Sequence, residues 1–278
     1  MKKKENEEKD KSIIFTITTC KRYDLFEKTM NSLINCTPEN DLKYIKCWLC
    51  VDDNSVEEDR QKMKNNYPFF TFIWKNVEEK GHIPSMNIIR NYVLESGCTH
   101  TLHMEDDWQS VVYFNSLSRA LEIMENDKSI KQVVYNRNYV QNICVQDIDL
   151  NGGIRKYIEF PIIKNDRYNK YILHQFIHQQ SEEFIQYIES INNAPTIVNW
   201  PYYSLNPSVL SVDVYKACGI FEKITWHFEF DYAVKFLYNG FRTAFFDGIY
   251  KLHIGKPLGS NDEKNAYDLN NEIKFVEE

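Results

Sequence analysis

The sequence lacks the glycine-rich loops with which many α/β proteins hold phosphate groups. It has 9 glycines in 278 residues, and neither a Gly-x-Gly-x-x-Gly fingerprint nor a Walker loop occurs. Both loops depend on glycine because their backbone turns tightly and approaches the phosphates closely. Their absence excludes the classical dinucleotide-binding fold and the P-loop enzymes.

Long apolar runs are absent too. No stretch of eighteen apolar residues occurs, so the sequence predicts no membrane-spanning helix. Residues 1–11 are almost all Lys, Glu and Asp, and we expect them to form a disordered, solvated tail. The apolar stretch after this tail is soon interrupted by Lys21 and Arg22, which makes it too short for a signal peptide.

An excess of positive charge is also missing. The 33 basic residues are outnumbered by 40 acidic residues, and the net charge is −7. Broad nucleic-acid binding needs a basic surface that displaces counterions, so we expect no nucleic-acid partner. A hydrophobic fraction of 43% is typical of a folded globular protein.

The seven cysteines form no recognisable frame. Cys47 and Cys50 make one Cys-x-x-Cys, but they fall in a predicted strand, where positions three apart point to opposite faces. We therefore expect buried free thiols rather than a zinc or redox site. Free thiols favour a reducing compartment and predict a cytoplasmic location.

The sequence does show strands and helices alternating over its first hundred residues. β-rich runs predict strands, and apolar side chains at helical spacing predict helices. The predicted strands are residues 13–17, 43–51, 69–74 and 99–104, and the predicted helices are residues 26–34, a short one from 55, and 86–94. Ser55 and Glu58 form a capping box for the short helix, and Gly97 ends the last one. This alternation is typical of an α/β domain with a mostly parallel sheet.

The rest of the chain alternates less clearly. Residues 136–205 show no clean pattern. Beyond them Gly240 ends a predicted helix over residues 229–238. The further predicted strands are residues 130–135, 208–211, 242–246 and 249–252.

Polar clusters follow three of the predicted strands, at residues 18–22, 52–55 and 105–107. In parallel sheets, ligands bind outside the carboxyl ends of the strands. The last cluster is three adjacent carboxylates, which repel one another unless a cation neutralises them. Mg²⁺ or Mn²⁺ would do so and would complete its shell with phosphate oxygens, which implies a nucleotide or another diphosphate. A charged turn is the alternative, although the cluster lacks the Gly, Pro or Asn usual in turns.

These residues resemble the nucleotide-sugar-dependent glycosyltransferases of the GT-A fold, and most closely their inverting family 2 type. The resemblance spans residues 12–255, is strongest over the first hundred of these and is thin over residues 136–205. It implies a Rossmann-like α/β domain, with a mostly parallel sheet flanked by helices and a C-terminal acceptor-side subregion. In it, residues 12–135 would bind the nucleotide sugar, and residues 136–278 would bind the acceptor and supply the catalytic base.

The resemblance places the nucleotide-sugar donor on four segments. Val51-Asp-Asp-Asn-Ser55 looks like the family's Val-Asp-Asp-Gly-Ser, in which an acid reads the base and ribose. We expect one of its two Asp residues to do this and the other to be structural. The opening loop after the first strand, the helix entry from Gly81 and the acids of the Asp-x-Asp position would complete the site. The implied donor residues are Thr18, Thr19, Arg22, Asp52, Asp53, Asn87, Glu105 and Asp106.

The resemblance also implies a metal site. Asp107 takes the place of the metal-binding acid of the Asp-x-Asp motif, with Glu105 as a further candidate. His253 looks like the late histidine that often completes the metal shell in this fold. An ordinary hydrogen-bonded histidine on a strand is the alternative.

The catalytic base is implied by a helix motif. Residues 228–235 look like the family's Glu-Asp-x-Asp-Leu-Ala-x-Arg, which puts Glu229 at the base position and Asp231 at a supporting acid. The two are about 200° apart on a helix, so at most one can face the site. Acids at the N-terminus of an ordinary amphipathic helix are the alternative.

An aromatic wall is expected on the acceptor side, because sugars stack their C–H faces on aromatic rings. The candidates are Trp200, Tyr202, Asn206, Trp226 and His227, although plain core aromatics are the alternative. The predicted activity is a Mn²⁺- or Mg²⁺-dependent, hexosyltransferase-like transfer from a UDP sugar to a glycan or other hydroxyl acceptor, with inversion. A sugar nucleotidyltransferase or a non-catalytic glycan-binding relative is the alternative. The loop after the first strand lacks the Gly that a nucleotidyltransferase would need.

Overall fold

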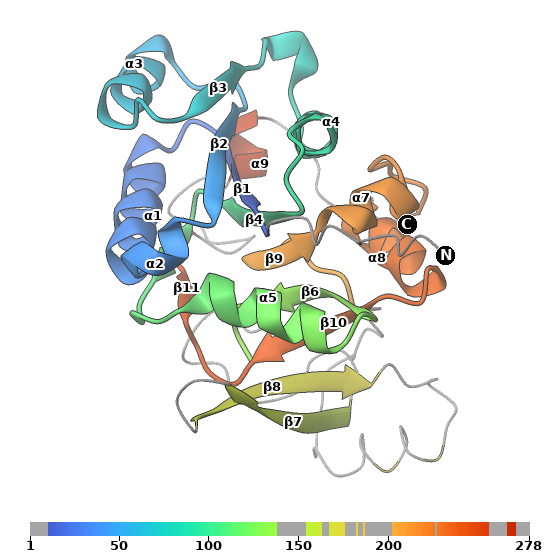
Figure 1. Cartoon of the computed structure of the whole chain (residues 1–278). Coiled ribbons are helices and arrows are strands. Elements are labelled where there is room, and N and C mark those ends of the chain that lie inside the picture. The colour runs from blue at the N-terminus through green and yellow to red at the C-terminus, as the bar shows by residue number, and fades with distance from the viewer. Residues whose placement is uncertain are drawn as a thin grey trace, which may run out of the picture.

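A nine-stranded sheet forms the centre of the molecule, with helices on both of its faces (Figure 1). This computed structural model describes residues 11–137, 154–162, 167–175, 182, 186, 202–225, 227–255 and 266–270. The strand order is β3-β2-β1-β4-β9-β6-β10-β8-β7. The predicted α/β architecture with a mostly parallel sheet is confirmed.

The first four strands in the chain are parallel neighbours. They are β1 (Ile13–Thr19), β2 (Ile45–Asp52), β3 (Thr71–Trp74) and β4 (His100–Glu105). Their connections contain α1 (Tyr23–Cys36), α2 (Glu39–Leu42), α3 (Glu57–Asn66), η1 (Val77–Glu79) and α4 (His82–Glu95). Thr18 of β1 is in register with Val51 on one side and Glu105 on the other, so the carboxyl ends of these strands meet at one edge.

Strand β1 is buried on both faces, as parallel strands in α/β domains usually are. Phe15 packs in a cluster with Phe26 of α1, and Ile14 packs in a second cluster with Ile89 of α4. All four side chains are 0% exposed. Burial of each contributes roughly 1.5–3 kcal/mol. The alternation along β1 therefore fixes one helix on each face and holds the edge of the sheet in place.

The rest of the chain continues the same sheet. Its elements are α5 (Ser116–Asn126), β6 (Ile130–Val134), β7 (Ile154–Ile162), β8 (Arg167–Gln175), β9 (Ser208–Ser211), α7 (Val212–Cys218), α8 (Phe228–Tyr238), β10 (Arg242–Phe246) and α9 (Ala266–Asn270). Strand β9 runs antiparallel between β4 and β6, and β10 is parallel to β6 and antiparallel to β8. A separate two-stranded sheet pairs β5 (Trp108–Ser110) with β11 (Lys251–His253).

The predicted capping box at Ser55 is wrong. Helix α3 begins at Glu57, and its N-cap, Val56, makes no side-chain cap. The Ser55 hydroxyl instead accepts the backbone N–H of Lys21 at 2.8 Å, because the loop after β1 lies against it. A capping box does form further on, between Asn76 and Glu79 of η1.

The β7–β8 hairpin also went unpredicted, since residues 136–205 show no clean alternation. The expected tail over residues 1–11, except for Lys11, lies outside the described residues, as do Trp200 and Trp226. Within the described part, the cysteines are free thiols and no helix is long and apolar enough to cross a membrane.

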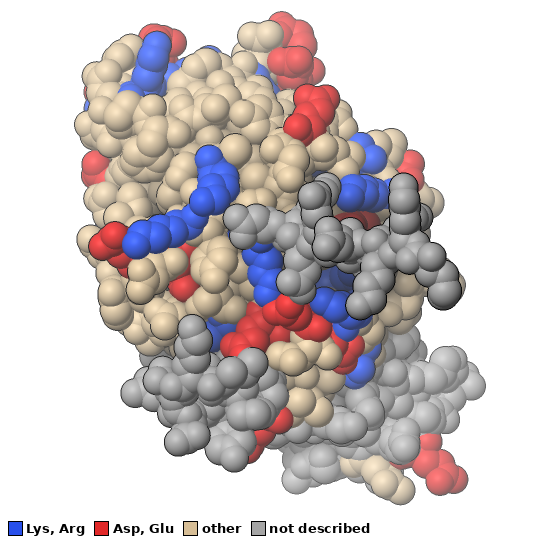
Figure 2. Space-filling model, viewed as in Figure 1, with Lys and Arg blue, Asp and Glu red and all other residues tan. Residues whose placement is uncertain are grey.

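Charges of both signs share the described surface seen in Figure 2, where blue and red side chains lie next to one another. Ion pairs of this kind occur among the described residues, such as Lys131 Nζ with the carboxylate of Asp213 at 3.1 Å.

Candidate active site

A cavity of about 50 Å³ opens at the carboxyl edge of the parallel strands. The loop after β1, the ends of β2 and β4, the start of α4 and the short helix α9 line it. Of the predicted donor residues, the structure brings together five at this cavity: Thr18, Thr19, Arg22, Asp53 and Glu105.

The two adjacent Asp residues after β2 have different partners. Asp52 is 0% exposed, and its Oδ2 accepts Nε–H of Arg60 at 2.7 Å and the backbone N–H of Ser55 at 3.2 Å. Asp53 faces the cavity instead. Successive side chains of an extended strand point to opposite sides, which accounts for this divergence. Asn54 then turns the chain with a left-handed φ of 66°, a conformation that Asn tolerates better than most residues.

Asp53 is held by a buried cation that sequence reasoning missed. Nζ of Lys75, directly after β3, lies 2.9 Å from Oδ1 of Asp53 and also donates to Gly81 O and Ser85 Oγ. The Lys75 side chain is 0% exposed, so its charge is stable only because these three acceptors surround it. The sequence signal for this buried cation was a single Lys directly after the apolar run of β3.

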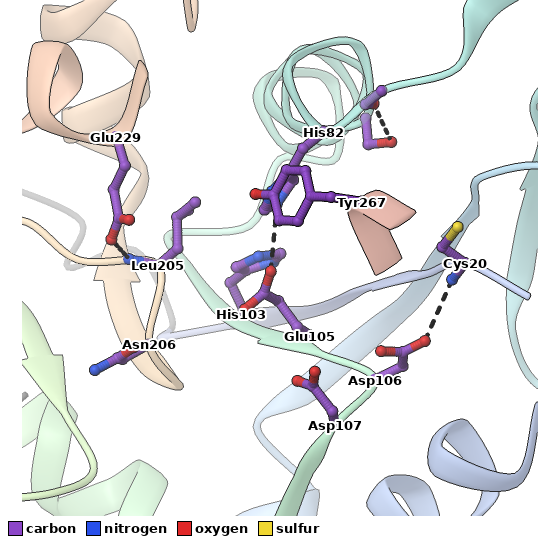
Figure 3. A network of polar contacts seen from close by, with 12 residues as sticks. Cys20, His82, His103, Glu105, Asp106, Asp107, Leu205, Asn206, Glu229 and Tyr267 are labelled. Carbon is purple, nitrogen blue, oxygen red and sulfur yellow. Dashed lines mark hydrogen bonds and ion pairs between the residues drawn. The ribbon is translucent and has the colours of Figure 1, made fainter. Parts of the chain in front are cut away.

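The three consecutive acids point in three directions (Figure 3). Glu105 turns towards His82, with Oε1 3.6 Å from Nε2 of the imidazole. Asp106 turns inwards, where it accepts hydrogen bonds from Thr19 Oγ1 at 2.8 Å and from the backbone N–H of Cys20 at 3.2 Å. Burial raises the pKa of Asp106 to about 7, although Arg22 beside it acts in the opposite direction.

Asp107 faces a histidine from the other half of the chain. The β5–β11 pairing sets His253 opposite Trp108, and Nε2 of His253 lies 3.3 Å from Oδ2 of Asp107. Burial would raise the pKa of Asp107, but His253 and the Arg22 guanidinium at 2.9 Å outweigh it and hold that pKa below its usual value.

A divalent ion fits this pair. Oδ1 of Asp107 is buried and accepts no hydrogen bond in the structure, and the imidazole of His253 is next to the same carboxylate. One carboxylate and one imidazole are enough protein ligands for an ion that takes its remaining ligands from phosphate and water. Among the described residues no three His, Cys, Asp or Glu side chains gather around one point, and Glu105 points towards His82 rather than to this pair.

Glu229 and Asp231 occupy different environments, as the helical spacing predicts. Oε1 of Glu229 accepts the backbone N–H of Leu205 at 2.7 Å (Figure 3). Leu205 lies in the loop that leads into β9. Because β9 is antiparallel to β4, this loop meets the sheet at the edge where β4 ends with Glu105. Asp231 binds instead the backbone N–H groups of Ile224 and Thr225, at 2.7 and 2.9 Å.

The remaining predicted residues are spread around this edge. Asn87 lies outside the cavity, because its amide makes two hydrogen bonds of 2.8 Å with the backbone of Phe221. Asn206 lies beside Leu205 near Glu229 (Figure 3). His227 is buried and its Nδ1 is 4.0 Å from Oε2 of Glu229, whereas Tyr202 is half-buried.

Several solved structures share this architecture. A structure of GalNAc-T7 with UDP, GalNAc and Mn²⁺ matches 90% of this chain with a TM-score of 0.55 and 14% identity. The mannosyltransferase PcManGT from Pyrobaculum calidifontis, in complex with GDP-Man and Mn²⁺, matches 89% with a TM-score of 0.52 and 11% identity. Residues 1–349 of S. aureus TarS match 86% with a TM-score of 0.53 and 10% identity.

The likeness is structural, and partial in length. No family model matches the sequence, and no curated protein is similar to it in sequence. The chain spans 45%, 58% and 60% of the three matched chains. The strand order, the site at the carboxyl edge and these neighbours agree with the predicted resemblance: the chain has the GT-A fold of nucleotide-sugar glycosyltransferases.

Proposed function

We propose that this protein is a metal-dependent glycosyltransferase that moves a sugar from UDP to a hydroxyl acceptor with inversion. One observation carries the proposal: Asp53, the Asp107–His253 pair and Glu229 come from distant segments and gather at one edge of the sheet. Two of the matched structures are complexes of a nucleotide or nucleotide sugar with Mn²⁺, which supports the same class of activity.

The donor would lie across the ends of β1, β2 and β4. Asp53 is suited to accept an N–H of the base or a ribose hydroxyl, because carboxylates form strong charge-assisted hydrogen bonds. Arg22, with five N–H donors, stands beside the acids and can pair with phosphate oxygens. Glu105 and His82, which both line the cavity, would flank the sugar.

Asp107 and His253 would hold the divalent ion, Mn²⁺ or Mg²⁺. When bound, the ion offsets the negative charge that grows on the departing diphosphate. Arg22 already neutralises Asp107 in part, and it would share the diphosphate with the metal.

Glu229 would act as the base. Its carboxylate takes the proton of the acceptor hydroxyl while that oxygen attacks the sugar on the face opposite the leaving diphosphate, which inverts the anomeric centre. The N–H of Leu205 orients this carboxylate. Asp231 acts through the backbone of residues 224–225 as a positioning residue, and Asn206, His227 and Tyr202 would line the acceptor side with Trp200 and Trp226.

The test is the metal-dependent binding of UDP. Mn²⁺ with UDP should raise the melting temperature of the wild type, since a ligand at 100 times its Kd stabilises by about 2.7 kcal/mol. Asp107→Ala should abolish this shift and leave the apo protein about as stable, because a crowded acid is removed. Asp213→Ala, which removes an exposed acid on α7, is the matched control.

An unchanged shift in Asp107→Ala would refute the metal site. The reaction class is read from the product: a glycosyltransferase releases UDP from a UDP sugar, whereas a sugar nucleotidyltransferase releases pyrophosphate from UTP. Screening donors for UDP release with and without Mn²⁺ therefore also tests the alternative activity.

A further inference from the structure

The short helix α9 fills the part of the cavity where Asp53 lies. It comes from near the C-terminus of the chain, yet it lies beside the edge of β1 and β2 (Figure 1). The backbone carbonyls of Leu269 and Asn270 accept the ammonium groups of Lys21 and Lys80, at 2.9 and 3.0 Å. The segment is thus attached on two sides of the cavity.

Asn270 makes the contact that a nucleotide base would be expected to make. Its side chain is buried, and its Nδ2 donates to Oδ2 of Asp53 at 2.6 Å. An amide N–H bound to a carboxylate is chemically the same bond as the imide N–H of a pyrimidine bound to that carboxylate.

Asp53 has no acceptor position left for a ligand while α9 is in place. An ionised carboxylate offers about four acceptor sites. In this structure they are taken by Gly81 N and Asn270 Nδ2 on Oδ2, and by Lys75 Nζ and Asn54 Nδ2 on Oδ1. A base could therefore bind Asp53 only by replacing one of these donors. Asn270 is the donor that comes from outside the strand-end loops.

The volume of the cavity also indicates that a nucleotide cannot enter while α9 is in place. Ligand pockets usually measure about 300–1,000 Å³, whereas about 50 Å³ remains here beside α9. Tyr267 takes up part of the difference, since its hydroxyl lies 3.1 Å from Nδ1 of His82 (Figure 3).

We propose that α9 is an internal pseudo-ligand that closes the base end of the donor pocket, so that UDP binds only when α9 leaves. This inference rests on the proposed function for the identity of the competing nucleotide. A pocket that is open for only a fraction of the time binds its ligand with an affinity reduced by that fraction. The segment thereby inhibits the enzyme until a donor, or another partner of α9, displaces it.

The test compares UDP affinity, in the presence of Mn²⁺, between the wild type and Asn270→Ala. Loss of a hydrogen bond to a charged group favours the open state, so the affinity for UDP should rise by about tenfold. Asn126→Ala, at the exposed end of α5, is the matched control and should bind as the wild type does. An unchanged or weaker affinity in Asn270→Ala would overturn the proposal, because α9 would then be neutral or part of the ligand site.

A second measurement needs no nucleotide. The Sγ of Cys20 lies 3.8 Å from the carbonyl of Ala266, and Cys20 is buried next to α9. Asn270→Ala should therefore speed the alkylation of Cys20 by iodoacetamide, read by peptide mass spectrometry, with the fully buried Cys50 as the internal reference.

Together, the two measurements distinguish a failure of the proposed function from a failure of the proposal about α9. Faster alkylation of Cys20 without UDP binding in any variant would keep α9 as a plug and overturn the proposed function. UDP binding in the wild type, with equal alkylation rates and equal affinities in both proteins, would keep the function and overturn the plug.

Discussion

Neighbouring residues with the same chemistry have different surroundings in this protein. Asp52 and Asp53 are adjacent carboxylates, but Asp52 turns inwards to Arg60 and Asp53 turns to the cavity. Successive side chains at the end of a strand point to opposite sides, which separates the two. At the scale of the residue, function therefore depends on the direction of a side chain as much as on its type.

This difference predicts unequal effects of substitution. Asp53→Asn keeps the shape of the side chain but removes the charge that would bind the nucleotide, so UDP affinity should fall by about tenfold or more. Asp52→Asn should leave UDP affinity nearly unchanged and lower the free energy of unfolding by about 1–3 kcal/mol, because the buried contact with Arg60 is weakened. Calorimetric titration and urea unfolding measure the two quantities. Equal losses of affinity in both variants would contradict the assignment.

A substitution of Glu229 tests the proton-transfer step directly. Glu229→Gln keeps the hydrogen-bond acceptor for Leu205 N–H but cannot take a proton, so the rate of transfer should fall by about 10²–10⁴-fold. The affinity for the donor should hardly change, since a group that acts only in the transition state adds nothing to ground-state binding.

Asp231→Asn, two residues further along α8, is the matched control for Glu229→Gln. It should cost stability, because the N–H groups of Ile224 and Thr225 lose their charged acceptor, with at most a modest loss of rate. A large loss of rate in Asp231→Asn together with an active Glu229→Gln would make Asp231 the base.

At the scale of elements, two antiparallel pairings assemble the site. Strand β9 enters between β4 and β6, and thereby brings the loop that holds Glu229 to the edge where the acids lie. Strand β11 pairs with β5 and brings His253 to Asp107. Each pairing places one candidate site residue of the second half beside the first half.

Gly255, in the turn after β11, offers a test of the proposed metal site that leaves Asp53 and its surroundings unchanged. A Cβ added at Gly255 would meet the side chain of Asp107, with 2.9 Å to its Cβ. Because Asp107 is buried and cannot move away freely, Gly255→Ala should displace the carboxylate and weaken Mn²⁺ binding by about tenfold or more. A Mn²⁺ titration of the thermal shift with UDP checks this, and circular dichroism confirms that the fold is retained. An unchanged Mn²⁺ requirement would show that Asp107 does not hold the ion.

At the scale of the whole molecule, one sheet joins the two predicted halves. Strand β9 of the second half lies between β4 and β6 of the first half, and β10 of the second half pairs with β6 on its other side. The core lies on both faces of this sheet, in one cluster around Phe15 and another around Ile14. The site therefore lies at the edge of a sheet that is packed on both faces, and α9 is added to it from near the C-terminal end of the described residues.

Much of the fold could be predicted from local pattern. The strands around Ile17, Val51 and Met104 and the helix around Ile89 lie where apolar spacing predicted them, because burial on a strand or helix imposes that spacing. The capping box at Ser55 failed because a distant loop, at Lys21, supplied a competing hydrogen bond. A capping rule based on sequence spacing fails where a tertiary contact offers the capping hydroxyl another hydrogen-bond partner.

The sequence by itself determined the alternation of elements and the acids at the end of β4. These features depend on neighbours in the chain, whose periodicity and sterics are local. Only the tertiary structure decided that Lys75 is buried under Asp53, that His253 meets Asp107, and that Asn270 reaches Asp53 from 217 residues away. Such contacts depend on packing between distant segments, and no local pattern in the sequence encodes which of the many possible partners will meet.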